Sequence, residues 1–253
     1  MSKTALLDAL KTFDVGKVQS ILGGQPALRE LRSDKGFDLL QMTASRSTAD
    51  DPAAAERQLE LARWLVSQGF DPMVTHTTKP GEDGEQDPAV LSLVFFAVAR
   101  AQNNALVRYF LDLGVKAEGL FAAAWWGNWE ILEDLVTRGA NVNEFVGATP
   151  LHMAVGVLDR GVAGKPALAK RRLRTLHEFL RLGADPNIAA VDRDTPLHAT
   201  LRKGYDVSVF SMLLDYGANP DVPGREGRTV RDIASRKRDK TYLYAVERRA
   251  RSR

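Results

Sequence analysis

The tetrapeptide Thr-Pro-Leu-His occurs twice in this chain, at residues 149–152 and 195–198. Each copy leads into apolar stretches that end in Gly-Ala, at Gly183 and at Gly217. Thr is a favourable N-cap, and Pro is tolerated at the first helical position because its missing N–H has no intrahelical partner there. Gly readily adopts the left-handed conformation that ends many helices. Each segment therefore predicts a cap, a helix whose buried face begins at Leu151 or Leu197, a link, a second helix and a glycine stop.

This pattern resembles the ankyrin repeat, a unit of about 33 residues with a turn, two helices and a Thr-Pro-Leu-His-x-Ala signature. The resemblance implies an all-α ankyrin-repeat solenoid of stacked antiparallel helix pairs with projecting turns or β-hairpin fingers. One helix pair cannot bury its apolar face alone, so neighbouring pairs must stack and share a core. The resemblance also implies that the protein binds other proteins.

The terminal glycine locates weaker copies of the repeat along the whole chain. Apolar runs also end at Gly69, Gly114 and Gly139, and the steps from Gly69 through to Gly217 are 45, 25, 44 and 34 residues. The terminal units are degenerate, as the end caps of repeat arrays tend to be. We expect a single ankyrin-repeat domain over 1–253, with units at approximately 1–24, 36–69, 91–114, 119–139, 148–183, 194–217 and 228–250.

Three insertions account for most of the irregular spacing. Residues 47–55 and 156–172 separate the two helices of their units, and the second insertion predicts a loop and then an extended helix from Pro166 with a basic outer face. The apolar positions expected in that helix are Leu173, Leu176, Phe179 and Leu180. Residues 77–88 lie in a turn and are polar, acidic and rich in Gly and Pro. We expect this turn to be a mobile finger that proteases cut first.

The fourth unit is short, because only six residues separate Gly114 from its first core residue, Leu120. Its projecting turn must be missing or abbreviated. Trp125 and Trp126 occupy the two variable positions that face the recognition surface in ankyrin repeats, whereas counting back from Gly139 places Trp129 in the core. The tryptophan pair is then either a partner-binding hot spot at the floor of a notch or filler packed beneath the neighbouring insertions.

The same register extends this surface row to the other units. Its members are Arg100 and Ala101, Gly156 and Val157, Arg202 and Lys203, and Arg236 and Lys237. The position of the motif histidine, which ties neighbouring turns together in this family, is occupied elsewhere by Gln41, Phe96, Phe121 and Asp232. The two phenylalanines suggest a more apolar interior in the third and fourth units. The candidate partner-binding residues are Trp125, Trp126, Arg100, Arg202, Lys203, Arg236 and Lys237.

The charge is unevenly distributed along the chain. Residues 1–150 contain 14 basic and 20 acidic side chains, and residues 151–253 contain 21 basic and 12 acidic ones. The densest basic runs are 170–174, 236–238 and 248–253. These charges either solvate a long surface or steer an oppositely charged partner to the C-terminal half. Nucleic acid is an unlikely partner, because no aromatic stacking residues or groove-reading motif accompany the basic runs.

Catalysis finds no support in the motifs of the chain. Its four histidines lack metal-pair spacing, and there is no nucleophile elbow, phosphate loop or dinucleotide motif. We therefore expect no enzyme activity, no cofactor and no metal. The chain has no cysteine, which excludes disulfides and thiolate sites. No apolar run approaches the roughly 20 residues of a membrane span, and no signal peptide is recognisable, so we expect a cytoplasmic location.

Two functions are compatible with these features. The first is a monomeric binding module, such as an adaptor, inhibitor or immunity-type protein, that holds a partner protein on its concave face. The alternative is a scaffold whose basic C-terminal half binds an anionic surface such as nucleic acid or lipid headgroups. Salt separates the two, because the second interaction weakens steeply with ionic strength.

Overall fold

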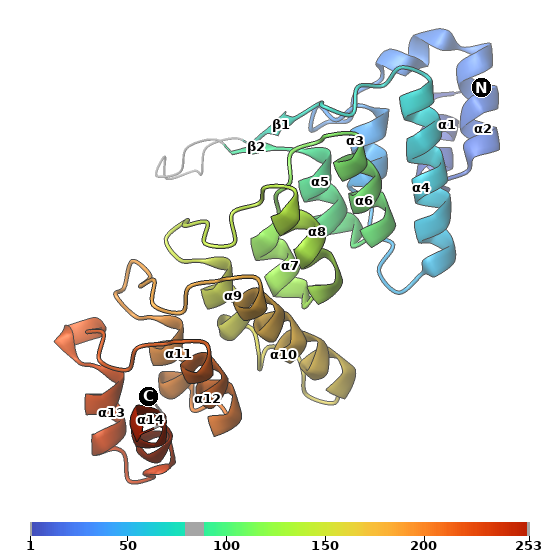
Figure 1. Ribbon diagram of the computed structural model, residues 1–253. Coiled ribbons are helices and arrows are strands. Elements are labelled where there is room, and N and C mark those ends of the chain that lie inside the picture. The colour runs from blue at the N-terminus through green and yellow to red at the C-terminus, as the bar shows by residue number, and fades with distance from the viewer. Residues whose placement is uncertain (1, 79–88, 252–253) are drawn as a thin grey trace. The chain divides into compact units, whose positions relative to one another are not determined.

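The computed structural model describes residues 2–78 and 89–251 and divides the chain into two compact units, residues 1–119 and 120–253. Each unit consists of consecutive antiparallel helix pairs that stack side by side (Figure 1). This arrangement confirms the predicted class, an all-α stack of helix pairs with little strand. Among the described residues, no helix has both the length and the apolar character needed to cross a bilayer.

Among its described residues, the N-terminal unit contains three helix pairs. They are α1 (Lys3–Thr12) with α2 (Val15–Gly24), α3 (Leu39–Ala44) with α4 (Pro52–Ser67), and α5 (Leu93–Phe96), which continues as a π-helix (η2, Ala97–Ala101), with α6 (Asn104–Asp112). A short 3₁₀ helix, η1 (Pro26–Glu30), follows α2. Strands β1 (His76–Thr77) and β2 (Val90–Leu91) pair antiparallel, with Thr77 opposite Val90. We expect the mobile finger at residues 77–88; Thr77 belongs to β1, and residues 79–88 lie outside the described residues.

Within residues 120–251, the described part of the C-terminal unit, there are four helix pairs. They are α7 (Leu120–Trp126) with η3 (Trp129–Ile131) and α8 (Leu132–Thr137), α9 (Pro150–Gly156) with α10 (Pro166–Arg181), α11 (Pro196–Lys203) with α12 (Val207–Asp215), and α13 (Val230–Arg236) with α14 (Thr241–Arg251). A 3₁₀ turn, η4 (Arg225–Gly227), lies before α13. The first helices α7, α9, α11 and α13 contact one another in sequence, so their C-terminal ends lie along one side of this unit.

Local chemistry explains where these helices begin and end. Thr149 and Thr195 stand at the N-caps of α9 and α11, and proline occupies the first turn of each helix. Leu151 and Leu197, the first apolar residues of the motif, are fully buried. The glycines that we used to find the repeats all have positive φ: Gly69, Gly114, Gly139, Gly183 and Gly217. The helix boundaries predicted from cap and glycine therefore follow the backbone closely.

The motif histidines connect neighbouring repeats, as the resemblance implies. His152 Nδ1 accepts the backbone N–H of Thr149 at 3.2 Å, and its Nε2 lies 3.1 Å from the carbonyl oxygen of Asp194 in the next turn. His198 makes the equivalent contact with the carbonyl oxygen of Arg228 at 3.2 Å. Each imidazole thus closes its own helix cap and holds the following turn.

Other residues at this position behave according to their chemistry. Gln41 accepts the N–H of Asp38 at 3.0 Å and donates to the carbonyl of Thr75 at 3.1 Å, so an amide reproduces the histidine bridge. Phe96 is fully buried and meets other rings, as expected for a more apolar interior. Phe121 is only partly buried, so that expectation is wrong for the fourth unit.

Both inter-helix insertions lengthen the second helix of their unit. Pro166 begins α10 as predicted, and Pro52 begins α4 behind the N-cap Asp51. The faces of α10 differ from the prediction, because Arg172 is buried whereas Leu173 is 37% exposed. The basic outer face therefore lacks one arginine, which points into the protein instead.

Candidate functional site

The tryptophan pair stands at the C-terminal end of the short helix α7. Trp125 is 37% exposed and Trp126 is 38% exposed, so the predicted accessibility of the pair is confirmed. The preceding connection is short, since α6 ends at Asp112 and α7 begins at Leu120. Both indoles therefore combine partial burial with a surface that a partner can reach.

Trp129 is not the core residue that glycine counting predicts. It begins the 3₁₀ turn η3 and is only partly buried, and the Arg174 guanidinium carbon lies 3.4 Å from its ring centroid. The core of this helix consists instead of Ile131, Leu132 and Leu135, which are fully buried. A tight 3₁₀ start turns the side chains differently from an α-helix, so the count along an ideal helix misplaces the first residues.

A buried arginine fastens the loop between α9 and α10 to the end of α7. Arg172 is only 7% exposed. Its Nη1 donates to the carbonyl oxygen of Val157 at 2.5 Å and to that of Arg160, and its Nη2 donates to the carbonyl oxygen of Trp125 at 3.4 Å. The loop in turn places the Arg160 guanidinium 5.5 Å from the centroid of the Trp125 ring. The tryptophan backbone and ring are therefore held by two arginines.

Electrostatics explain how this guanidinium is tolerated inside the protein. Two of its acceptors, the carbonyls of Trp125 and Val157, stand at the C-terminal ends of α7 and α9, where helix carbonyls carry partial negative charge, and the third, that of Arg160, lies in the loop after α9. Burial lowers the pKa of Arg172, but a guanidinium stays charged in proteins. Its Nε atom is buried and has no hydrogen-bond partner among the described residues. Gly127 makes room for this side chain, because a Cβ there would lie 3.1 Å from Arg172 Cγ.

Lys203, at the end of α11, joins its helix to α9. Its ammonium donates to the carbonyl of Gly156 at 2.8 Å and lies 3.6 Å from Asp159 Oδ1. The Tyr205 hydroxyl donates to the same carboxylate at 2.8 Å, and this hydrogen bond is the main reason why the pKa of Asp159 is lowered. The loop after α9 is thus bound on both sides, by Arg172 and by the end of α11.

Helix α13, the first helix of the last pair, continues the same series of contacts. Arg236 is exposed, and the Lys237 ammonium lies 5.6 Å from the centroid of the Tyr242 ring. The Tyr242 hydroxyl donates to the carbonyl of Tyr205, which follows α11. We call the surface connected in this way the first-helix edge, and its residues are Trp125, Trp126, Arg160, Lys203, Tyr205, Arg236 and Lys237.

Two of the other predicted residues lie elsewhere. Arg202 turns towards the preceding turn, where its Nε lies 2.7 Å from Oδ2 of the buried Asp194, a carboxylate shared with Arg225 at 3.1 Å. Arg100 belongs to the N-terminal unit, is exposed and lies 5.9 Å from the centroid of the Phe96 ring. Both side chains are positively charged, but Arg202 mainly neutralises the buried carboxylate of Asp194.

The register also misplaces two apolar members of the row. Ala101 and Val157 are buried, so neither contributes surface. Each carbonyl is instead a hydrogen-bond acceptor, for Thr48 in the first case and for Arg172 in the second. Ala101 ends the π-helix η2 and Val157 is the C-cap of α9, so both lie where the backbone departs from a regular α-helix and the repeat count no longer predicts direction.

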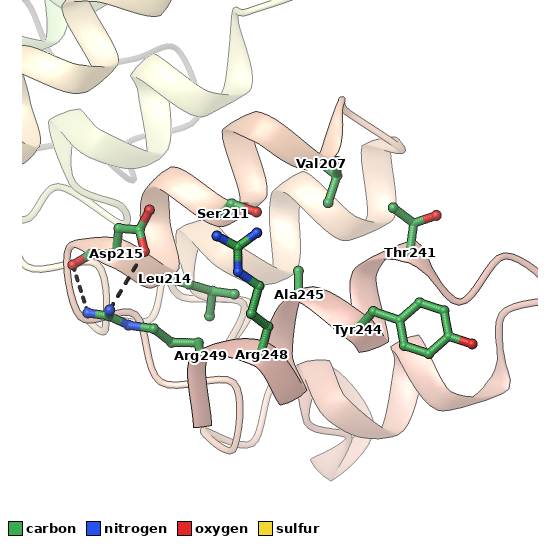
Figure 2. Close-up of a pocket in the computed structure, with 9 residues that line it drawn as sticks. All are labelled: Val207, Ser211, Leu214, Asp215, Thr241, Tyr244, Ala245, Arg248 and Arg249. Atoms are coloured by element: carbon green, nitrogen blue, oxygen red, sulfur yellow. Dashed lines mark hydrogen bonds and ion pairs between the residues drawn. The ribbon is translucent and has the colours of Figure 1, made fainter. Parts of the chain in front are cut away.

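A second surface feature lies between α12 and α14, the second helices of the last two pairs. A groove of about 410 Å³ separates α12 from α14 and contains Arg248 and Arg249 of the C-terminal basic run (Figure 2). The other lining residues are Val207, Ser211, Leu214, Asp215, Thr241, Tyr244 and Ala245. Sequence analysis identified the basic run but not the groove, since the packing of α14 on α12 is a tertiary feature.

The histidines are accounted for by structural contacts. Burial lowers the pKa of His152 and of His198. The His76 ring meets the Phe37 ring edge-on at 4.5 Å, and His177 Nε2 lies 3.1 Å from the Tyr216 hydroxyl. In the described part of the chain, no group of three His, Asp or Glu side chains is arranged to hold a metal ion.

Stacked helix pairs with threonine caps, histidine bridges and glycine stops define a helical repeat protein. The family model of the ankyrin repeat matches residues 192–225, and the fold of the chain is that of an ankyrin-repeat solenoid. Ankyrin-repeat domains are generally protein–protein interaction modules and are generally not enzymes.

The chain is also similar to known proteins that carry ankyrin repeats. Human ankyrin repeat and SOCS box protein 16 is 27% identical over 208 residues, which are 67% of this chain and 46% of that protein. Mouse ankyrin repeat and SOCS box protein 11 is 31% identical over 114 residues, 43% of this chain and 29% of that protein. The chain thus matches less than half the length of these relatives. The crystal structure of the human ASB11 ankyrin repeat domain superimposes with a TM-score of 0.69 at 21% identity, covering 97% of this chain and 98% of that one.

Proposed function

We propose that this protein is a non-enzymatic binding module that holds a partner protein on the first-helix edge of its C-terminal unit. The observation that carries the proposal is the pair Trp125 and Trp126, both more than a third exposed and held against arginines. Tryptophan and arginine are enriched at interface hot spots, and partly buried indoles lose little conformational entropy when a partner covers them.

The partner that suits this edge has an apolar group flanked by acidic side chains. The apolar group would cover the two indoles, and the acidic groups would meet Arg160, Lys203 and Arg236. Asp159 is already engaged by Lys203 and Tyr205, so it offers little repulsion to such a partner. Charges at the rim of an interface mainly steer association and select the partner.

Partner capture with matched variants tests the proposal. Immobilised protein is exposed to an extract of the source cells, and retained proteins are quantified by mass spectrometry. The change W125A/W126A should weaken retention of the partner by about 2 kcal/mol or more, the usual mark of a hot spot. The control L173A/Y216A removes two side chains of similar exposure, 37% and 39%, from the second helices and should leave retention unchanged.

Circular dichroism must show both variants folded. Equal retention by wild type and W125A/W126A contradicts the proposal. Retention that collapses with moderate salt and depends on nucleic acid or lipid supports the alternative, a scaffold for an anionic surface. We further propose that the protein acts in the cytoplasm as a monomer. Light scattering of the purified chain tests the monomeric state.

A further inference from the structure

The groove between α12 and α14 has the composition of a binding site for an acidic peptide (Figure 2). Its volume of about 410 Å³ lies within the range of about 300–1,000 Å³ that is typical of ligand pockets. Val207, Leu214 and Ala245 form an apolar floor between the helices. Tyr244 extends away from them and is 66% exposed, an unusual degree of exposure for a large aromatic side chain.

Two arginines supply positive charge inside the groove. Arg248 extends from α14 into the space between the helices, towards the Ser211 hydroxyl (Figure 2). Arg249 is held loosely by Asp215, with Nη2 3.2 Å from its carbonyl oxygen and Nη1 3.8 Å from its carboxylate. The buried Nε of Arg249 has no hydrogen-bond partner among the described residues. A carboxylate in the groove would give these guanidinium groups charge-assisted hydrogen bonds.

An acidic side chain also limits what the groove can accept. Asp215 lines the groove and is exposed. A nucleic acid would bring evenly spaced phosphates past this carboxylate, which disfavours it. A single carboxylate flanked by aliphatic side chains matches the pattern, with its charge at the arginines and its apolar groups on the floor.

We propose that the α12–α14 groove binds an acidic, otherwise apolar peptide segment of a partner protein, with Arg248 and Arg249 holding its carboxylate. This site lies on the second helices and is separate from the first-helix edge, which is formed by the ends of the first helices. A partner could therefore occupy either surface alone, and the two proposals stand or fall independently.

NMR of the isotope-labelled full chain tests this proposal with defined probes. The acetyl-Leu-Glu-Leu amide peptide should shift the Nε–Hε signal of Arg248 and the methyl signals of Val207 and Leu214. The isosteric acetyl-Leu-Gln-Leu amide should bind about fivefold more weakly or worse, because it lacks the charge. R248Q should weaken the Glu peptide to the same degree, whereas R238Q, an exposed arginine outside the groove, should not.

A second variant tests the same site by adding a negative charge to the groove, so that the result does not depend on small movements of the arginine side chains. Ser211→Asp places a carboxylate within the groove and should abolish binding of the Glu peptide while the helical spectrum stays intact. The proposal is overturned if the Glu and Gln peptides bind equally, or if R238Q weakens binding as much as R248Q does. It is likewise overturned if a short oligothymidylate shifts the same signals at lower concentration than the peptide, which would assign the groove to nucleic acid.

Discussion

At the scale of single residues, the repeat is held by side chains that serve two neighbours at once. His198 accepts an N–H of its own cap through Nδ1 and contacts the turn before α13 through Nε2. Position 224 in that turn excludes any residue other than glycine, because a Cβ there would lie 2.5 Å from His198 Nε2. The contact is therefore as close as the backbone allows, and it fixes the spacing of two repeats.

The buried imidazoles predict a pH dependence of stability. Burial lowers the pKa of His152 and His198 below the ordinary 6.5, so the unfolded chain binds protons first as the pH falls. Stability is therefore full well above that pH and decreases as the pH falls through it towards the lowered pKa values of the folded state. The variant H152Q/H198Q should lose much of this dependence and keep the bridges, since Gln41 makes the same contacts. Urea unfolding at several pH values measures the free energy of unfolding. An identical pH dependence of this free energy in variant and wild type would refute the explanation.

Core leucines predict the largest single-residue losses. Leu197→Ala empties a fully buried position and should lower the free energy of unfolding by about 2–5 kcal/mol. Leu173→Ala provides the matched control, because its side chain is partly exposed and its loss should cost much less. Denaturant titrations compare the two, and similar losses would mean that the burial of the first helices is misassigned.

At the scale of elements, the two inter-helix insertions share one construction. Helices α4 and α10 both begin with proline, and each carries a buried polar side chain eleven residues before its terminal glycine, Gln58 or Arg172. Gln58 donates to the carbonyls of Thr43 in the last turn of α3 and of Arg46 after it, as Arg172 does to those after α9. In the unit of α6 the same position is the N-cap, Asn103. A helix extended beyond its usual cap thus places a polar side chain where the loop carbonyls need a donor.

This construction predicts what holds the α9–α10 loop. Arg172→Ala removes three hydrogen bonds to loop and helix-end carbonyls, each worth about 1.5–3 kcal/mol when one group is charged. Hydrogen exchange of residues 157–165 should then become about tenfold faster or more. The neighbouring Arg174→Ala removes only the contact with the Trp129 ring and should leave that loop protected. Unchanged exchange in the first variant would show that the loop is held by other contacts.

The sequence identifies caps and stops well and side-chain directions near irregular turns poorly. Threonine, proline and glycine act within one turn of the chain, so the bounds of α9 and α11 follow from the motif alone. Trp129 was misplaced because the helix begins with a 3₁₀ turn, which periodic counting treats as regular. Arg202 appeared to be a surface residue because its partner Asp194 lies in the preceding turn and is not marked by any spacing rule. The α12–α14 groove depends on tertiary packing and leaves no local signal.

At the scale of the whole molecule, we propose that both units form a single ankyrin-repeat domain. The repeat register runs through Gly114 and Gly139 on either side of the division at residue 119. Neighbouring repeats couple strongly, so one domain should unfold in one transition. A variant that keeps only Trp64 should report the same fluorescence midpoint for the N-terminal unit as circular dichroism reports for the whole chain. Two separate midpoints would show that the units fold independently.

The central claim is that partner binding uses the first-helix edge, and a hydrogen-exchange footprint of the complex with the captured partner tests it most directly. We expect protection on binding to concentrate at residues 125–126, 157–160, 203–205 and 236–237, all within the C-terminal unit. We expect little change at the outer residues of α10, near Leu173. Protection confined to the second helices, with the residues around Trp125 and Trp126 unchanged, would contradict it.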